Sequence, residues 1–294
     1  MQTRTLSSED WVPLYLESET RVRTLVNLAE LLGQSKDYTA TQAIVTHLQK
    51  FDATDRQRYQ GRLYYLQGQN AYATECYSEA VEWFQRWLQA SRRAAPSRRQ
   101  GIAHFNVAVA LEQVGSNPVR IIEHFQEARR IFERTDSAVE CGLTDYSMAR
   151  TYLTTGDFTH AFEAYQKAEA ILTDTKLLAE IALGKSICTW GLQGPDNGYL
   201  AFQKLPDAFN EPDQKARAYH NLGVISRQRN RIPKAFEYLE QALLYHPQPD
   251  QRMATTLAEL CLCHLLAGQT FKEASRQWDT VFRGCHTLWL LSLF

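Results

Sequence analysis

The sequence lacks any apolar stretch that approaches the ~18 residues needed to cross a lipid bilayer as a helix. It also lacks a dominant charge, because 32 basic side chains are matched by 33 acidic ones and the formal net charge is −1. A chain without a basic excess gives no sign of binding a polyanion. We therefore expect neither a membrane nor a nucleic acid as partner.

A secretory signal is missing too, since residues 1–20 are polar and contain no apolar run. The six cysteines are scattered along the chain at Cys76, Cys141, Cys188, Cys261, Cys263 and Cys285. Thiols of a protein that is not exported are expected to stay reduced. The sequence therefore predicts a cytoplasmic protein.

Motifs for catalysis and metal binding are also absent from the sequence. It contains no glycine-rich phosphate loop, no nucleophile elbow and no pair of acids with catalytic spacing. Cys261 and Cys263 are two residues apart, so on a helix their thiols face apart and cannot close on one zinc ion. Cys261 is instead predicted to be a small core residue. We expect no enzyme activity, no cofactor and no metal ion.

What the chain does contain is a pattern of apolar, aromatic and small residues that recurs about every forty residues. Its clearest copy is Met148-Ala149, Tyr152, Gly156-Asp157-Phe158, Ala161, Tyr165 and Ala168. A second copy is Leu222-Gly223, Ser226, Asn230-Arg231-Ile232, Ala235, Leu239 and Ala242. The same spacing at two distant places is typical of a solenoid of repeated helical units.

The leading pair of this pattern can be followed through seven units. It falls at Leu28-Ala29, Gln67-Gly68, Val107-Ala108, Met148-Ala149, Leu183-Gly184, Leu222-Gly223 and Leu260-Cys261. Apolar residues at helical spacing in each half predict two amphipathic helices per unit. Turns between the paired helices are predicted at Gly115-Ser116, Gly156-Asp157, Asn230-Arg231 and Gly268-Gln269.

The residue types fit close helix packing. A small residue such as Ala161 or Ala235 lets the second helix approach the first, and an aromatic such as Tyr152 or Phe158 fills the remaining wedge. This constellation resembles the tetratricopeptide repeat over residues 21–285. The resemblance implies an all-α, right-handed superhelical solenoid of about seven helix pairs. Units longer than the family's ~34 residues look like those of bacterial intracellular peptide-pheromone receptors and regulators.

The predicted organisation follows from these repeats. Residues 1–20 form an N-terminal segment, and residues 21–190 hold repeats one to four and the start of repeat five. Glycines and a proline make 191–198 an extended loop or a joint between two sub-stacks. Residues 199–285 complete repeats five to seven. Residues 286–294 are an apolar C-terminal tail.

The resemblance also implies a ligand groove, because the first helix of each pair lines the concave face of such an array. The residue before the leading pair points into that groove, and at three units it is an asparagine: Asn27, Asn106 and Asn221. A side-chain amide donates and accepts at once, so these side chains are predicted to hold an extended peptide backbone. The alternative is that asparagine is merely tolerated on a solvated helix face.

Basic and aromatic residues lie along the same predicted face. The basic ones are Arg62, Arg150, Lys185, Arg217 and Arg227, and the interleaved rings are Tyr65, Phe105, Tyr146 and His220. Arginine forms paired hydrogen bonds with carboxylates, and aromatic faces accept apolar side chains. These residues are predicted to bind carboxylates and side chains of the ligand. Ordinary surface charge is the alternative.

A second basic run, Ser91–Arg99, carries four arginines and joins repeats two and three. Such a run could contact phosphate or RNA. We expect a solvated loop instead, because acidic residues balance the chain and no aromatic platform accompanies the run.

The sequence thus predicts a non-catalytic binding protein that captures a peptide or an extended protein segment, as a regulatory receptor or adaptor. The alternative is a static assembly scaffold that uses its convex face or its apolar tail. A terminal repeat needs a polar outer face, whereas Leu288–Phe294 is apolar. A homodimer through the C-terminal end is therefore also expected.

Overall fold

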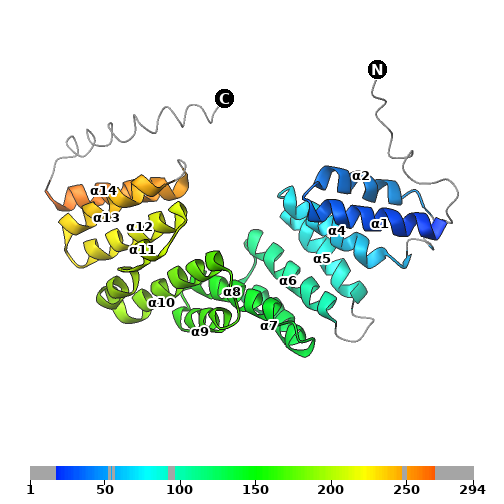
Figure 1. Ribbon diagram of the computed structural model, residues 1–294, viewed down its shortest axis with the longest axis horizontal. Helices are drawn as coiled ribbons and strands as arrows, with labels where there is room; N and C mark the ends of the chain where they lie inside the picture. The colour runs from blue at the N-terminus through cyan, green and yellow to red at the C-terminus, as the bar shows by residue number, and fades with distance from the viewer. Residues whose placement is uncertain (1–17, 52–53, 55–56, 92–96, 247–249, 269–294) are drawn as a thin grey trace, which may run out of the picture. The chain divides into compact units, whose positions relative to one another are not determined.

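The computed structural model describes residues 18–51, 54, 57–91, 97–246 and 250–268. Every regular element within these ranges is a helix (Figure 1). The predicted all-α fold is confirmed. No helix in the described part of the chain is both long enough and apolar enough to cross a membrane.

The chain divides into two compact units, with the boundary between Thr151 and Tyr152. The first unit contains α1 (Ser18–Gln34), α2 (Tyr38–Leu48), α4 (Gln60–Ala73), α5 (Tyr77–Ser91), α6 (Arg98–Gln113), α7 (Pro118–Arg134) and most of α8 (Ala138–Thr154). The second contains α9 (Phe158–Glu169), α10 (Thr175–Phe202), α11 (Leu205–Ala208), α12 (Pro212–Gln228), α13 (Ile232–Tyr245) and α14 (Gln251–Leu266).

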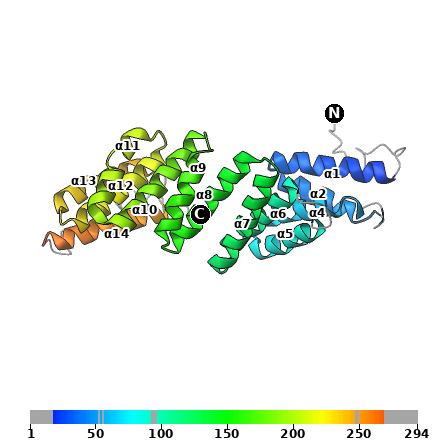
Figure 2. The same cartoon turned by 90° about the horizontal axis from the view of Figure 1, so that it is seen from below.

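The helices pack in consecutive pairs, as the repeat pattern predicts. Helix α1 packs against α2, α4 against α5, α6 against α7, and α12 against α13. Each pair then packs on its neighbour in the same unit, α5 on α6 and α13 on α14 (Figures 1 and 2). Each array is therefore a stack in which a helix contacts elements close to it in the sequence.

Small residues on one helix receive large side chains from its partner. Phe84 and Phe132 are almost fully buried. A Cβ atom added to Gly68 would lie 2.4 Å from the Phe84 ring, and one added to Gly101 would lie 2.6 Å from the Phe132 ring. The ring occupies the space that a methyl group would need, so glycine sets how closely the two helices approach.

Sharp turns begin the second helix of several pairs. The predicted turn residues Gly115, Gly156, Asn230 and Gly268 all have positive φ, which confirms these four positions. After one of them, the Asp157 carboxylate accepts a hydrogen bond from the backbone N–H of His160 at 3.2 Å and caps α9. The turn conformation and the cap are both encoded locally.

The prediction of an extended loop at 191–198 is wrong. Helix α10 consists here of two helices that meet at Gly194, whose φ of 82° and ψ of −178° turn the chain back, so that the Ser186 hydroxyl donates to the backbone carbonyl of Ala201 at 3.3 Å. Gly191 lies in the first of these two helices, and a Cβ atom there would lie 2.5 Å from the Phe158 ring, so the position requires glycine for close packing. The two compact units also divide near Thr151 rather than at this segment. The glycines thus serve close packing and a tight turn between two helices.

Two expectations about the last predicted repeat have different outcomes. Cys263 is the fully buried cysteine of α14, whereas Cys261 is half-buried, so the prediction of Cys261 as the core residue is wrong. The predicted apolar tail at 286–294 lies outside the described residues.

The glycine contact leads to a stability prediction. We expect Gly68→Ala to lower the free energy of unfolding by about 1–3 kcal/mol, because the new methyl group would overlap the buried Phe84 ring. Gly61→Ala in the same helix is the control, since its Cβ would lie 3.7 Å from the nearest atom and stability should change by less than about 1 kcal/mol. Urea unfolding monitored by circular dichroism measures both, and equal effects would contradict the prediction.

Candidate binding surfaces

The three predicted backbone-binding asparagines fall in both units. Asn27 on α1 is exposed, and its Oδ1 accepts a hydrogen bond from Arg62 Nη2 at 2.7 Å. Asn106 on α6 and Asn221 on α12 are half-buried, and their amides have no hydrogen-bond partner within the described ranges. Both amides are therefore available to a ligand, and the peptide-binding role of all three remains a prediction.

Four of the five predicted cationic residues already have carboxylate partners on neighbouring helices. The Arg62 guanidinium on α4 contacts the Glu30 carboxylate on α1. The remaining pairs are Lys185 with Glu169 at 2.6 Å, Arg217 with Glu180 at 2.7 Å, and Arg227 with Glu259 at 2.8 Å. Three of these pairs link the first helices of successive repeats, and a ligand carboxylate would compete with these acids.

Arg150 differs from those four. Its side chain is exposed, its guanidinium carbon lies 5.9 Å from the centre of the Tyr146 ring, and it forms no ion pair with any residue that the structure describes. Phe105, in contrast, packs edge-on against Phe125 with ring centres 5.5 Å apart. Of these predicted residues, Arg150 is the better placed to bind an anion, whereas Phe105 contributes to packing.

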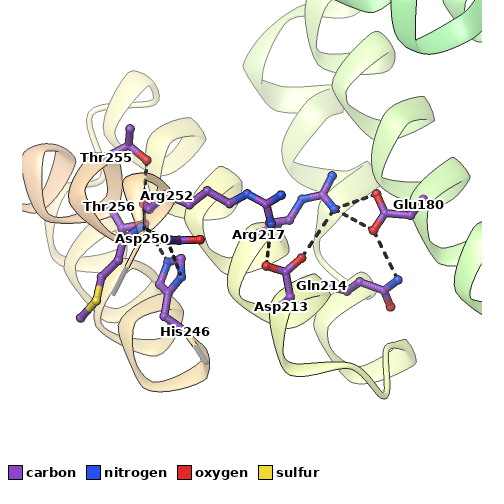
Figure 3. A network of polar contacts seen from close by, with 10 residues as sticks. Glu180, Asp213, Gln214, Arg217, His246, Asp250, Arg252, Thr255 and Thr256 are labelled. Carbon is purple, nitrogen blue, oxygen red and sulfur yellow. Dashed lines mark hydrogen bonds and ion pairs between the residues drawn. The ribbon is translucent and has the colours of Figure 1, made fainter. Parts of the chain in front are cut away.

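A polar network joins α10, α12 and α14 in the second unit (Figure 3). Asp213 accepts a hydrogen bond from Arg252 at 2.6 Å and lies 3.8 Å from Arg217. Gln214 is buried and donates to the backbone carbonyl of Lys176 at 3.2 Å. The network thus connects α10, α12 and α14, each of which contains the first helix of a repeat, within this unit.

Two histidines meet at one buried hydroxyl beside this network. The Thr256 Oγ1 donates to the backbone carbonyl of Arg252 at 3.0 Å. It lies 3.0 Å from His220 Nδ1 and 3.2 Å from His246 Nε2. Because the hydroxyl proton is already used, both rings must donate to Thr256, which fixes their tautomers. Burial lowers the pKa of His220 and of His246, and the positive charge of one ring would further disfavour protonation of the other.

A cleft of about 1110 Å³ lies in the first unit among α1, α4, α5 and α6. Tyr65 and Trp87 meet in its wall with ring centres 4.6 Å apart, and Gln69 donates to the Tyr65 hydroxyl at 2.5 Å. Burial first, and then the nearby Glu30 carboxylate, raise the pKa of Tyr65. Arginines and glutamines make up much of the remaining lining, namely Arg58, Arg62, Arg86, Arg98, Arg99, Gln34, Gln57, Gln60, Gln69 and Gln89.

The cleft contains two of the predicted site residues, Arg62 and Tyr65. It also contains Arg98 and Arg99 from the basic run at 91–99, in the same lining as Trp87. Trp87 is only 8% exposed and offers no open ring face for stacking, so the expectation that no aromatic platform accompanies this run stays a prediction. The shared lining was not predictable from the sequence, because the rings come from α4 and α5, whereas the two arginines begin α6.

Two segments of the chain match a known family of helical repeats. Residues 146–171 and 216–249 match the family model of the tetratricopeptide repeat. These two segments contain the two clearest copies of the repeat pattern. No curated protein matches the chain at a significant level.

Solved structures match at low sequence identity and show the fold alone. The apo form of the quorum sensor NprR from B. thuringiensis is 12% identical, with a TM-score of 0.70, and the match covers 89% of this chain and 74% of that one. The apo form of RapI is 12% identical, with a TM-score of 0.62 and coverage of 88% and 76%. BtubC from P. vanneervenii is 12% identical, with a TM-score of 0.54 and coverage of 80% and 94%.

The histidine pair predicts a pH-dependent stability. A histidine whose pKa is lowered by folding binds fewer protons in the folded than in the unfolded chain. The free energy of unfolding should therefore fall as the pH drops below about 6.5, by up to about 1.4 kcal/mol per pH unit for each histidine. Chemical unfolding between pH 7.5 and about 5.5 measures this slope.

The variant His220→Asn/His246→Gln tests the source of the slope. Its amide nitrogens stand in the positions of Nδ1 and Nε2, so both can still donate to Thr256 without titrating. We expect a flatter pH dependence than in the wild type. Identical slopes for the two proteins would show that other groups cause the effect.

Proposed function

Because this chain carries tetratricopeptide repeats, we propose that it is a non-catalytic binding protein that captures a peptide or an extended protein segment. It would act as a regulatory receptor or an adaptor. The observation that carries the proposal is the cleft of the first unit, which brings Arg62 and Tyr65 together with side chains from four helices.

The size and lining of the cleft favour a peptide over a small molecule. Its volume of about 1110 Å³ exceeds the ~300–1,000 Å³ of typical small-molecule sites, which are also predominantly apolar. Glutamine amides line this cleft, and each can pair with both the N–H and the carbonyl of a peptide backbone. An extended segment could therefore satisfy its backbone groups there.

The side-chain conformation of Arg62 is already fixed by hydrogen bonds before a ligand binds. Its Nε and Nη2 bind the Glu30 carboxylate, and Nη2 also donates to Asn27. Nη1 still offers N–H donors, and the side chain needs no further ordering when a ligand arrives. Asn27 then acts by orienting Arg62 rather than by binding the backbone directly.

The second unit carries predicted contact residues of its own. Asn221 has an amide without a partner among the described residues, and His220 lies beside it on α12. Arg217 and Arg227 lie on the same helix and Lys185 lies on α10, and each of the three is paired with an acid. The similarity in fold to a protein described as a quorum sensor supports a role in regulation.

A cleft-filling variant tests the proposal. Peptides selected from a random library against the full chain should lose at least about tenfold in affinity for Ala90→Trp, equivalent to ~1.4 kcal/mol. Ala90 is exposed in the lining of the cleft, so a tryptophan there fills the space without disturbing the core. The control Ala73→Trp is exposed on α4 outside the lining and should bind normally. Fluorescence anisotropy measures both affinities.

A static scaffold is the second candidate. The observation in its favour is a group of exposed leucines on α13 and α14, namely Leu244, Leu262, Leu265 and Leu266. Exposed apolar residues on neighbouring helices suit contact with another protein or a second copy of the chain. If no library peptide binds, and deletion of residues 287–294 dissociates a dimer or a complex in light scattering, the scaffold is the better description.

A further inference from the structure

One ring nitrogen of His246 is buried without a hydrogen-bond partner. The Thr256 hydroxyl donates its proton to the backbone carbonyl of Arg252, so His246 Nε2, at 3.2 Å, must donate to Thr256. A neutral imidazole carries one proton, which leaves Nδ1 as a bare acceptor. The His246 side chain is 2% exposed, and Nδ1 has no hydrogen-bond partner among the described residues. The surroundings of His246 therefore accommodate the neutral ring and not the charged one.

A proton on His246 Nδ1 would compete for the carboxylate that caps α14 (Figure 3). Asp250 Oδ1 lies 4.0 Å from Nδ1, which is too far for a hydrogen bond. The same oxygen accepts a hydrogen bond from the backbone N–H of Met253 at 2.9 Å and caps the helix. The new N–H could reach it only if the carboxylate left the cap or the ring moved. Either movement disturbs the start of α14.

His220 reaches the same hydroxyl from α12. Its Nδ1 lies 3.0 Å from Thr256 Oγ1, and the residue is half-buried. Thr256 on α14 is thus joined through one imidazole to α12 and through the other to the residue that ends α13. Burial lowers the pKa of both rings, and a positive charge on one opposes a charge on the other. The attachment of α14 therefore depends on two neutral histidines.

The acids around the two rings are already engaged. The charged groups there come from α10, α12 and α14 and from the cap of α14, namely Glu180, Asp213, Arg217, Arg227, Asp250, Arg252 and Glu259. Asp213 and Asp250 favour a charged His246, whereas Arg252 opposes it, and Glu259 favours a charged His220. Asp213 is bound by Arg252 at 2.6 Å, and Glu259 by Arg227 at 2.8 Å. Neither acid can turn to a ring without weakening its ion pair.

Helix α14 can leave without unfolding the rest of its unit. The core between α13 and α14 in the described part of the chain is small, with Leu260 and Cys263 packed against Ala235 and Leu239. In a stacked array a unit contacts only its neighbours, so a helix at one end can separate while the others stay folded. A charge under α14 would therefore be relieved by local separation before global unfolding.

We propose that His220, His246 and Thr256 form a pH switch that holds α14 against α12 and the end of α13 at neutral pH and releases it in acid. The docked rings bind fewer protons than the released rings, so release becomes more favourable as the pH falls below about 6.5. Release would separate Glu259 from Arg227 and expose Leu257, which is buried in the docked helix. The inference goes beyond the proposed function, because it concerns the second unit and requires no ligand.

Amide hydrogen exchange read by mass spectrometry on the full chain tests the switch. Protection factors, which correct for the effect of pH on the intrinsic exchange rate, are compared at about pH 7.5 and about pH 5.5. Protection of the α14 amides should fall by about tenfold or more in acid, because both rings take up protons on release. The amides of α6, α10 and α12 should keep their protection, since those helices remain packed.

Variants identify the titrating groups. In His220→Asn/His246→Gln the amide nitrogens can still donate to Thr256 but do not titrate, so α14 protection should no longer depend on pH. His246→Gln alone should reduce the acid effect without removing it, and it serves if the double variant fails to fold. His160→Gln is the control, because His160 is exposed on α9 of the same unit and should keep the wild-type response.

Three outcomes would overturn the switch. Loss of protection in α10, α12 and α14 together would mean that acid unfolds the whole unit. Unchanged protection of α14 at about pH 5.5 would mean that the helix stays docked. An equal acid effect in the double variant or in His246→Gln and in the wild type would place the titrating groups elsewhere. None of these results bears on peptide capture by the first unit, which the Ala90→Trp comparison tests separately.

Discussion

The whole array depends on how closely paired helices can approach. At Gly68, Gly101 and Gly223 the first helix of a pair has no side chain, and a large residue of the second helix occupies the space. Since each helix contacts only elements close to it in sequence, the spacing within one pair is passed to the next. The cleft among α1, α4, α5 and α6 lies between helices whose spacing is set by such contacts.

Arginines have two uses in this protein. In the second unit Arg217 and Arg227 form ion pairs with acids one repeat away. These pairs neutralise the arginine charges and link the helices. In the first unit, the described lining of the cleft contains five arginines and one carboxylate. The same residue type, on the same kind of helix, thus stabilises the array in one place and gives a surface its charge in another.

Features encoded by neighbouring residues were predictable from the sequence. The helix pairs and the turns at Gly115 and Gly156 follow from periodicity and from residues that tolerate a positive φ. The course of 191–198 was not predictable, because Gly191 is required by a contact with Phe158, more than thirty positions away. The acid partners of the arginines and the association of Trp87 with Arg99 were missed for the same reason. Such contacts are set by the register between helices, which composition and spacing within one helix do not reveal.

The hydrogen bonds of the Thr256 hydroxyl restrict which substitutions homologous proteins can carry at three positions. Its single proton and both lone pairs are used, by a carbonyl on its own helix and by two imidazoles from α12 and the end of α13. Exchange of the threonine for valine would leave two buried ring N–H groups without an acceptor. Loss of either ring would leave one lone pair of the hydroxyl without a donor. Substitutions at His220, His246 and Thr256 are therefore tolerated together more readily than singly, and these three positions are expected to covary among homologues.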